Sequence, residues 1–142
     1  MMGMLPQLQF IERGPASRIA IRAGNKILFI SSADIVAVEA EGHYVLLQHK
    51  SSAYTLRASI STMEEKLSLF GFVRIHRSCL VNAAFVEEIQ PLSTGEYVLR
   101  VRGGKKYTVT RTYKKNLHLL AESWIGIDGF VQMERGGLLT SE

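Results

Sequence analysis

The sequence predicts a mainly β fold with one or two short helices, and three observations support this class. Short runs rich in Ile, Val, Leu and Tyr follow one another from residue 19 onward, separated by groups that contain Gly, Asn, Asp or Ser. One segment near residue 60 instead spaces its apolar residues by three or four positions, as a helix does. The Gly103-Gly104 pair favours a tight hairpin, because both residues tolerate a positive φ.

Five strands are expected in the first part of the chain. They span residues 19–22, 26–30, 35–40, 44–49 and 54–57. The intervening groups, such as Gly24-Asn25, are short and rich in turn-forming residues. Neighbouring strands are therefore predicted to pair as antiparallel hairpins.

A short helix is predicted over residues 60–70, where the period of the apolar residues changes. Ser61 and Glu64 can form a capping box at its start, and Gly71 marks its end. The apolar face that would lie against a sheet consists of Met63, Leu67 and Phe70.

Strand character resumes after this helix, at residues 72–75, 85–90, 97–102 and 107–110. A second short helix is expected from about Lys115, because apolar residues recur at helical spacing beyond it. The residues that follow remain partly apolar. They could cover the core, form a dimer contact or pack on a further domain, and the sequence leaves these three possibilities open.

The length of the chain permits one domain with a substantial core. It has 142 residues, 46% of them hydrophobic, which is too little material for two domains. Residues 1–18 show no sustained period, so we interpret them as a leader or the remnant of a linker. The domain is expected over residues 19–118, followed by a C-terminal tail over residues 119–142.

Cysteine content and hydropathy predict a cytoplasmic protein. The single cysteine, Cys79, cannot form an intramolecular disulfide and is expected to face the core. The N-terminus lacks the features of a secretory signal, and no window approaches the ~18 consecutive apolar residues of a membrane span. No membrane contact is expected of this chain.

Basic residues are concentrated, although the formal net charge is only +4. Residues 97–121 contain no acidic side chain and carry many of the lysines and arginines. The stretch over residues 72–82 also places cationic and hydroxyl side chains between apolar ones, which packing alone does not require. Two such clusters on one small domain predict a nucleic-acid surface.

Three residues have the chemistry to contact bases. Arg77 follows a strand-like run, from which its guanidinium could donate two hydrogen bonds to guanine N7 and O6. Arg111, between two threonines and ahead of a tyrosine and two lysines, repeats that mixture. His43 lies at the tip of a predicted loop, where either ring nitrogen could meet a base edge or a phosphate.

The order of these motifs resembles the LytTR DNA-binding domain of bacterial regulators, over about residues 18–118. The motifs are Glu41-Gly42-His43-Tyr44-Val45, then Arg74-Ile75-His76-Arg77-Ser78 with Leu80-Val81-Asn82, and Val109-Thr110-Arg111-Thr112-Tyr113 ahead of the lysines. The resemblance implies an elongated arrangement of antiparallel sheets that sends loops, instead of a recognition helix, into successive major grooves. Cys79 stands where the family more often has an aromatic residue.

The resemblance also implies roles for individual residues. The base-contacting positions correspond to His43, Arg77 and Arg111. The positions that contact the DNA backbone correspond to Arg74, His76, Ser78 and Lys114, with Lys115 as a neighbour.

Other functional classes are less well supported by the sequence. One cysteine and four scattered histidines have no recognised ligand spacing, so neither a metal nor another cofactor is expected, and no enzymatic activity is predicted. RNA binding is disfavoured, because the basic motifs lack clustered aromatics for stacking unpaired bases. The main alternative is a protein-interaction module that docks a sensor or partner subunit through its apolar C-terminal tail.

We therefore expect a sequence-specific, double-stranded DNA-binding domain of a bacterial transcription regulator. One small domain contacts few base pairs, so two copies on a repeated promoter site, as a homodimer on DNA, are expected to supply useful affinity. Regulators of this family usually join such a domain to a receiver, sensory or membrane domain, so this chain could be the effector part of a longer parent chain, with a sensory or receiver domain, or a small stand-alone regulator.

Overall fold

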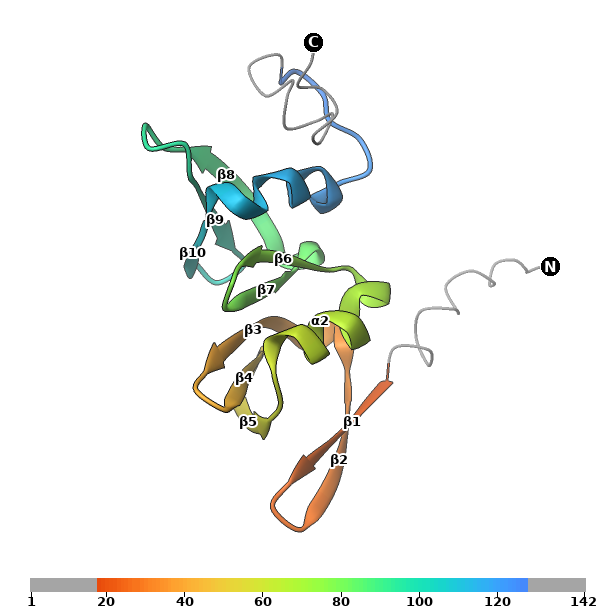
Figure 1. The fold of residues 1–142 in the computed structure, drawn as a ribbon. Coiled ribbons are helices and arrows are strands. Elements are labelled where there is room, and N and C mark those ends of the chain that lie inside the picture. The colour runs from red at the N-terminus through yellow and green to blue at the C-terminus, as the bar shows by residue number, and fades with distance from the viewer. Residues whose placement is uncertain (1–17, 128–142) are drawn as a thin grey trace, which may run out of the picture.

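In the computed structural model, which describes residues 18–127, three antiparallel sheets follow one another along the molecule (Figure 1). The predicted mainly β fold is confirmed, and so is the short helix near residue 60. The leader expected at the N-terminus of the chain, apart from Arg18, and most of the expected C-terminal tail lie outside the described residues. No helix in the described part is long and apolar enough to cross a membrane.

The first hairpin forms a sheet of its own. Strand β1 (Arg18–Ala23) pairs with β2 (Lys26–Ser31) around a turn at Gly24, whose φ is +67°. Its side chains are unevenly buried: Ile21 is 5% exposed, whereas Ile27 and Phe29 are 62% and 61% exposed. The hairpin thus packs on the core through Ile21 and the partly buried Ile19, Leu28 and Ile30, and it carries Ile27 and Phe29 in solvent.

The second sheet has five strands in the order β5-β4-β3-β7-β6. These are β3 (Ile35–Glu41), β4 (Tyr44–His49), β5 (Ala53–Arg57), β6 (Phe72–His76) and β7 (Cys79–Asn82), and a 3-10 turn, η2 (Ser32–Asp34), precedes β3. All four residues of β7 are buried, and its pairing with β3 joins the β6–β7 hairpin to the rest of the sheet.

Strand β7 departs from the sequence-based expectation. Within residues 72–82, only 72–75 were predicted to form a strand, whereas the whole stretch forms a hairpin whose turn is Arg77-Ser78. A strand buried on both faces shows no alternation of polar and apolar residues, so its pattern did not mark it as a separate element. Cys79 faces the core as expected and is 6% exposed.

Helix α2 (Ile60–Leu67) and the 3-10 turn η3 (Ser68–Phe70) cover one face of this sheet through Met63 and Leu67, which are both buried. The predicted capping box at Ser61 is wrong. The N-cap is Ser59, whose hydroxyl accepts a hydrogen bond of 3.0 Å from the backbone N–H of Thr62. The predicted end at Gly71 is confirmed, with a φ of +87° that glycine adopts without strain.

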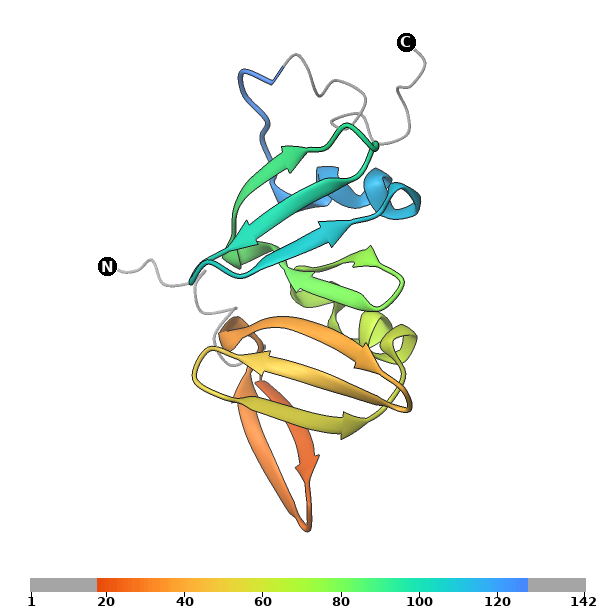
Figure 2. The same cartoon turned by 90° about the vertical axis from the view of Figure 1, so that its left-hand side faces the viewer.

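The third sheet has three strands in the order β10-β9-β8, shown uppermost in Figure 2. These are β8 (Val86–Pro91), β9 (Tyr97–Val101) and β10 (Lys106–Val109), preceded by the 3-10 turn η4 (Ala83–Phe85). The second helix was expected from about Lys115 but begins at Arg111. The whole segment, η5 (Arg111–Leu120), is 3-10 helical. Leu117, which is fully buried, anchors it.

Two hydrophobic cores meet at the β6–β7 hairpin. One packs the hairpin against the third sheet and η5, and its fully buried members are Ile75, Val81, Leu99, Val101, Val109 and Leu117. The other packs it against β3, β4 and α2, with the fully buried members Ile35, Val38, Val45, Leu47 and Leu80. Because neighbouring strand residues point to opposite faces, Leu80 and Val81 enter different cores. Partly buried Leu120 and Trp124 extend the first core beyond residue 118.

Candidate nucleic-acid interface

Two turns lie at the same end of the five-stranded sheet. Strand β3 leads into the Gly42-His43 turn, and β7 begins after the Arg77-Ser78 turn. The two strands are neighbours, with Glu39 opposite Cys79, and the Ala40 backbone N–H donates a 2.8 Å hydrogen bond to the Ser78 carbonyl. Strand pairing therefore brings His43 and Arg77, both exposed, to one edge of the molecule.

A third element joins them on that edge. The Thr110 backbone N–H donates a 3.1 Å hydrogen bond to the Ile75 carbonyl, which fixes the start of η5 beside β6. Arg111 follows directly and is exposed. Its aliphatic part lies over Gly95 in the β8–β9 turn, where a Cβ atom would be 2.9 Å from Arg111 Cδ.

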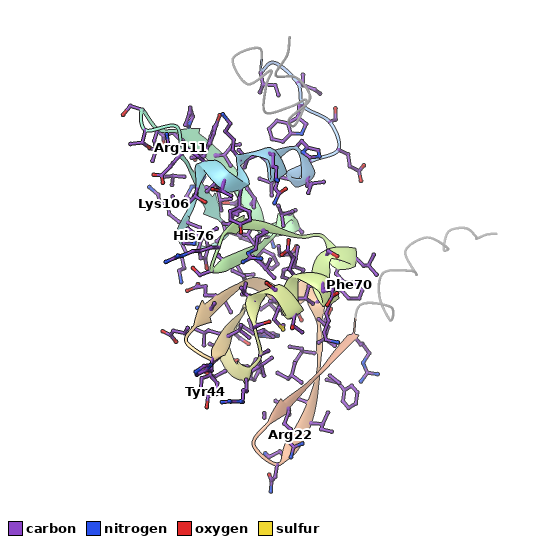
Figure 3. The ribbon with its side chains drawn as sticks, viewed as in Figure 1. Arg22, Tyr44, Phe70, His76, Lys106 and Arg111 are labelled. Carbon is purple, nitrogen blue, oxygen red and sulfur yellow. The ribbon has the colours of Figure 1, made fainter. Side chains whose placement is uncertain are left out.

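The figures show the three elements in a row. In Figure 2, the β3–β4 turn, the β6–β7 turn and the start of η5 follow one another along the right-hand edge. Figure 3 places Tyr44, His76, Lys106 and Arg111 along one side of the molecule. The three residues predicted to contact bases thus belong to three separate elements that share one side.

His76 and Ser78, the two polar neighbours of Arg77, are hydrogen-bonded to each other. The Ser78 backbone N–H donates to His76 Nδ1 at 3.1 Å, and the Ser78 hydroxyl lies 3.0 Å from the same nitrogen. A backbone N–H can only donate, so Nδ1 is the acceptor and the proton of the neutral ring is on Nε2. His76 Nε2 is therefore a donor of the kind that a phosphate oxygen accepts.

Arg74 has a different environment from its neighbours in the motif. Its side chain is 10% exposed, and its guanidinium donates 2.7 Å to Glu64 Oε1 and 2.9 Å to the His76 carbonyl. A further hydrogen bond runs to the Arg77 carbonyl, and the guanidinium carbon lies 5.3 Å from the centre of the Tyr113 ring. The Arg74 guanidinium is therefore held by groups of this protein, and its contact with the DNA backbone stays a prediction.

Lys114 is half-buried and Lys115 is exposed, both within η5. Within residues 18–127, no ion pair involves either lysine, Arg77 or Arg111. Their charge is therefore available to a phosphate backbone.

Several other cations of the basic segment already form ion pairs with glutamate side chains. Arg100 pairs with Glu87 and Glu88 at 2.9 and 2.8 Å, and its hydrogen bond to Glu88 holds the pKa of that carboxyl below its usual range. Lys106, by contrast, is exposed and forms no ion pair within the described residues. It was not predicted as a site residue, although its position on β10 puts it on the side that carries His76 and Arg111 (Figure 3).

A polar junction connects the second and third sheets next to this side. Glu39 Oε2 accepts hydrogen bonds from Lys105 Nζ at 3.0 Å, from the Tyr107 hydroxyl at 3.1 Å and from Gln48 at 3.5 Å. The junction borders a groove of about 360 Å³ that is also lined by Cys79. Burial and then the Glu39 charge raise the pKa of Cys79 to about 12, so the thiol stays protonated and is a poor nucleophile.

No group of three or more His, Cys, Asp or Glu side chains in residues 18–127 is arranged to hold a metal ion.

Comparisons with known proteins agree with the fold and with the family that the motifs resemble. The family model of the LytTr DNA-binding domain matches residues 25–122. The sensory transduction protein LytT of Bacillus subtilis is 33% identical over 103 residues, which are 72% of this chain and 43% of that protein. The positive alginate biosynthesis regulatory protein of Pseudomonas aeruginosa is 32% identical over 104 residues, 70% of this chain and 41% of that protein.

A solved structure shares the fold. It is the LytTr DNA-binding domain of a putative methyl-accepting/DNA response regulator from Bacillus cereus, with a TM-score of 0.65 at 20% identity. The match covers 75% of this chain and 98% of that one. Against the curated relatives, in contrast, the chain spans about two fifths of their length.

Proposed function

Because the chain belongs to the LytTR family of DNA-binding domains, we propose that it binds double-stranded DNA in a sequence-specific manner, as the effector domain of a bacterial transcription regulator. One observation carries the proposal: His43, Arg77 and Arg111 are exposed on three separate elements along one side of the molecule. Side chains on turns can enter a groove that the flanking strands do not enter.

We assign two kinds of contact to this side. Arg77 and Arg111 each offer a planar fork of donors that fits guanine N7 and O6, and His43 offers a single donor or acceptor to a base edge. Other side chains would bind phosphate oxygens, which are the same for every base. These side chains are His76, Ser78, Lys106, Lys114 and Lys115. The three base-contacting elements would meet successive major grooves on one face of the duplex.

Selection of duplexes from a random pool, followed by affinity measurements, tests the proposal. Arg77→Ala should weaken binding to the selected site by about 1 to 3 kcal/mol and change binding to random DNA little. Lys114→Ala should weaken both and lower the salt slope by about one. Arg100→Ala is the matched control, because its charge is paired with Glu87 and Glu88. Failure to select any sequence would contradict the proposal, and equal losses on both DNAs for Arg77→Ala would contradict the base contact.

We further propose that two copies act together on a repeated promoter site. The affinity of one small domain is limited by the few base pairs it contacts, and a second copy about one helical turn away would add to it. A nuclease footprint should therefore cover two half-sites. A single protected half-site at saturating protein would contradict this arrangement.

A longer parent protein is part of the same proposal. The relatives named as sensory transduction proteins are more than twice the length of the matched region. We propose that a sensory or receiver domain controls this one in the parent protein.

A further inference from the structure

The guanidinium of Arg74 is surrounded by groups from three different elements. It donates to the carbonyls of His76 and Arg77 in the β6–β7 turn, pairs with Glu64 on α2, and lies over the Tyr113 ring of η5. We infer that Arg74 is a positioning residue for DNA recognition, which presents Arg77 and Arg111 to the duplex in one fixed relation. This inference rests on the proposed function.

The β6–β7 turn needs such support because it is short and irregular. The strand register shifts between Arg74 and His76, and only Arg77 and Ser78 separate the two strands. Arg74 Nε donates to the His76 carbonyl and Arg74 Nη2 donates to the Arg77 carbonyl, so one planar group binds two successive carbonyls of the turn. Charged donors make stronger hydrogen bonds than neutral ones, which limits the orientations available to the Arg77 backbone.

The same residue is attached to the element that carries Arg111. The Asn116 side-chain amide donates a 2.9 Å hydrogen bond to the Arg74 carbonyl. Tyr113, on which the guanidinium lies, is two residues from Arg111. Arg74 thus contacts η5 through both its main chain and its side chain, and its side chain also contacts the Arg77 carbonyl in the turn.

Glu64 explains how the charge is tolerated at this depth. The Arg74 side chain is 10% exposed, and Glu64 Oε1 at 2.7 Å supplies the compensating negative charge. Lysine would preserve the charge but not the planar fork, because its three donors originate from one nitrogen. Arg74→Lys therefore separates the geometric role of Arg74 from its charge.

The test compares Arg74→Lys with wild type on the selected duplex and on random DNA. We expect about a tenfold loss on the selected site, little change on random DNA and an unchanged salt slope. Arg74→Lys should cost less in the background of Arg77→Ala than in wild type, because the part of its effect that acts through Arg77 is then already absent. Full affinity in Arg74→Lys, together with a salt slope reduced by about one in Arg74→Ala, would instead establish a phosphate contact and overturn the inference.

Two further measurements exclude a general loss of folding. Thermal unfolding of Arg74→Lys and Glu64→Ala should show that both variants are folded at the temperature of the binding assay. On α2, Glu64→Ala should reproduce part of the loss on the selected site, whereas Glu65→Ala, which removes an exposed charge from the same helix, should not.

Hydrogen exchange in the free protein tests positioning without DNA. In Arg74→Lys, the amides of Ser78 and Thr110, which bond to His76 and Ile75, should exchange faster, and the amide of Val101 in the third sheet should not change. If wild type selected no DNA sequence, the proposed function would fail, and this measurement would decide the positioning role alone. Unchanged exchange at Ser78 and Thr110 would overturn it.

Discussion

At the scale of single residues, burial changes the acidity of side chains. The pKa of Cys79 is raised from 9.0 to about 12, first by burial and then by the charge of Glu39. The pKa of Tyr107 is raised for the same two reasons and by its hydrogen bond to Glu39. Both groups stay protonated in the folded protein at a pH where the unfolded chain loses the proton.

Alkaline pH should therefore destabilise the protein partly through Cys79. The native state keeps the thiol proton while the unfolded state releases it above about pH 9, so this contribution to stability is complete below that pH and decreases toward pH 12. The expected slope is about 1.4 kcal/mol per pH unit for one such group. Urea unfolding at a series of pH values should show a shallower alkaline loss for Cys79→Ala than for wild type. Parallel curves would mean that the thiol does not contribute.

The residue scale also shows where sequence-based prediction reached its limit. The motif predicted a cationic segment, and Arg74 and Arg77 were both expected to contact DNA. Arg77 lies in the exposed turn after β6, whereas Arg74 lies within β6, where Glu64 of α2 and Tyr113 of η5 cover its guanidinium. Nothing in the local pattern announces that difference, because it depends on elements outside the motif. Lys106, which we propose as a phosphate contact, was not predicted for a related reason, since its side of the molecule depends on how the sheets are stacked.

At the scale of elements, the start of helix α2 provides a direct comparison between two serines. Ser59 caps the helix by accepting from the Thr62 N–H, whereas Ser61 is exposed within the first turn. Ser59→Ala should lower the free energy of unfolding by about 1 kcal/mol, because it leaves an N–H of the first turn without its acceptor. Ser61→Ala is the matched control and should change it by less than about 0.5 kcal/mol. Chemical denaturation measures both, and equal losses would contradict the assignment of the cap.

Most elements were predictable because their signals are local. Turn residues such as Gly24 and Gly42 separate strands with alternating burial, and the apolar spacing of Met63 and Leu67 identifies a helix. Strand β7 and the early start of η5 were not predicted, because partners distant in sequence determine them. Strand β7 is defined by β3 and β6, and η5 begins where Thr110 bonds to Ile75.

At the scale of the whole molecule, the Glu39 junction connects the second and third sheets. Removing this acceptor leaves the half-buried Tyr107 hydroxyl unpaired, so Glu39→Ala should cost about 1 to 3 kcal/mol of stability. The exposed ion pair with Lys105 adds little to that figure. Glu41→Ala is a matched control, because it removes the same charge from an exposed position on the same strand. Urea unfolding of the two variants checks the prediction, and equal stability would show that the junction contributes nothing.

The C-terminal segment gives a second prediction at this scale. Truncation after Asn116 removes the fully buried Leu117 and should destabilise the protein by at least about 2 kcal/mol. Truncation after Ile127 preserves the packed Leu120 and Trp124 and should leave the thermal midpoint and DNA affinity unchanged. Circular dichroism and a duplex titration measure the two effects.

The same pair of truncations tests the alternative function. If the main interaction were with a protein partner through the tail, truncation after Ile127 would weaken that interaction and spare DNA binding. Ile125, which is 85% exposed, would remain in that variant as a candidate contact. Loss of DNA affinity on truncation after Ile127 would show that the tail takes part in DNA binding itself.

The pairing of β3 with β7 has a consequence for protein engineering. It fixes the separation between the His43 and Arg77 turns through backbone hydrogen bonds, which do not depend on the side chains exposed at the turn tips. Under the proposed function, the side chains at the turn tips determine which bases are contacted, and the backbone pairing determines the spacing between the contacted bases. A library randomised at His43, Arg77 and Arg111 should yield proteins with new target sequences on an unchanged spacing, whereas changing the spacing would require a new strand register.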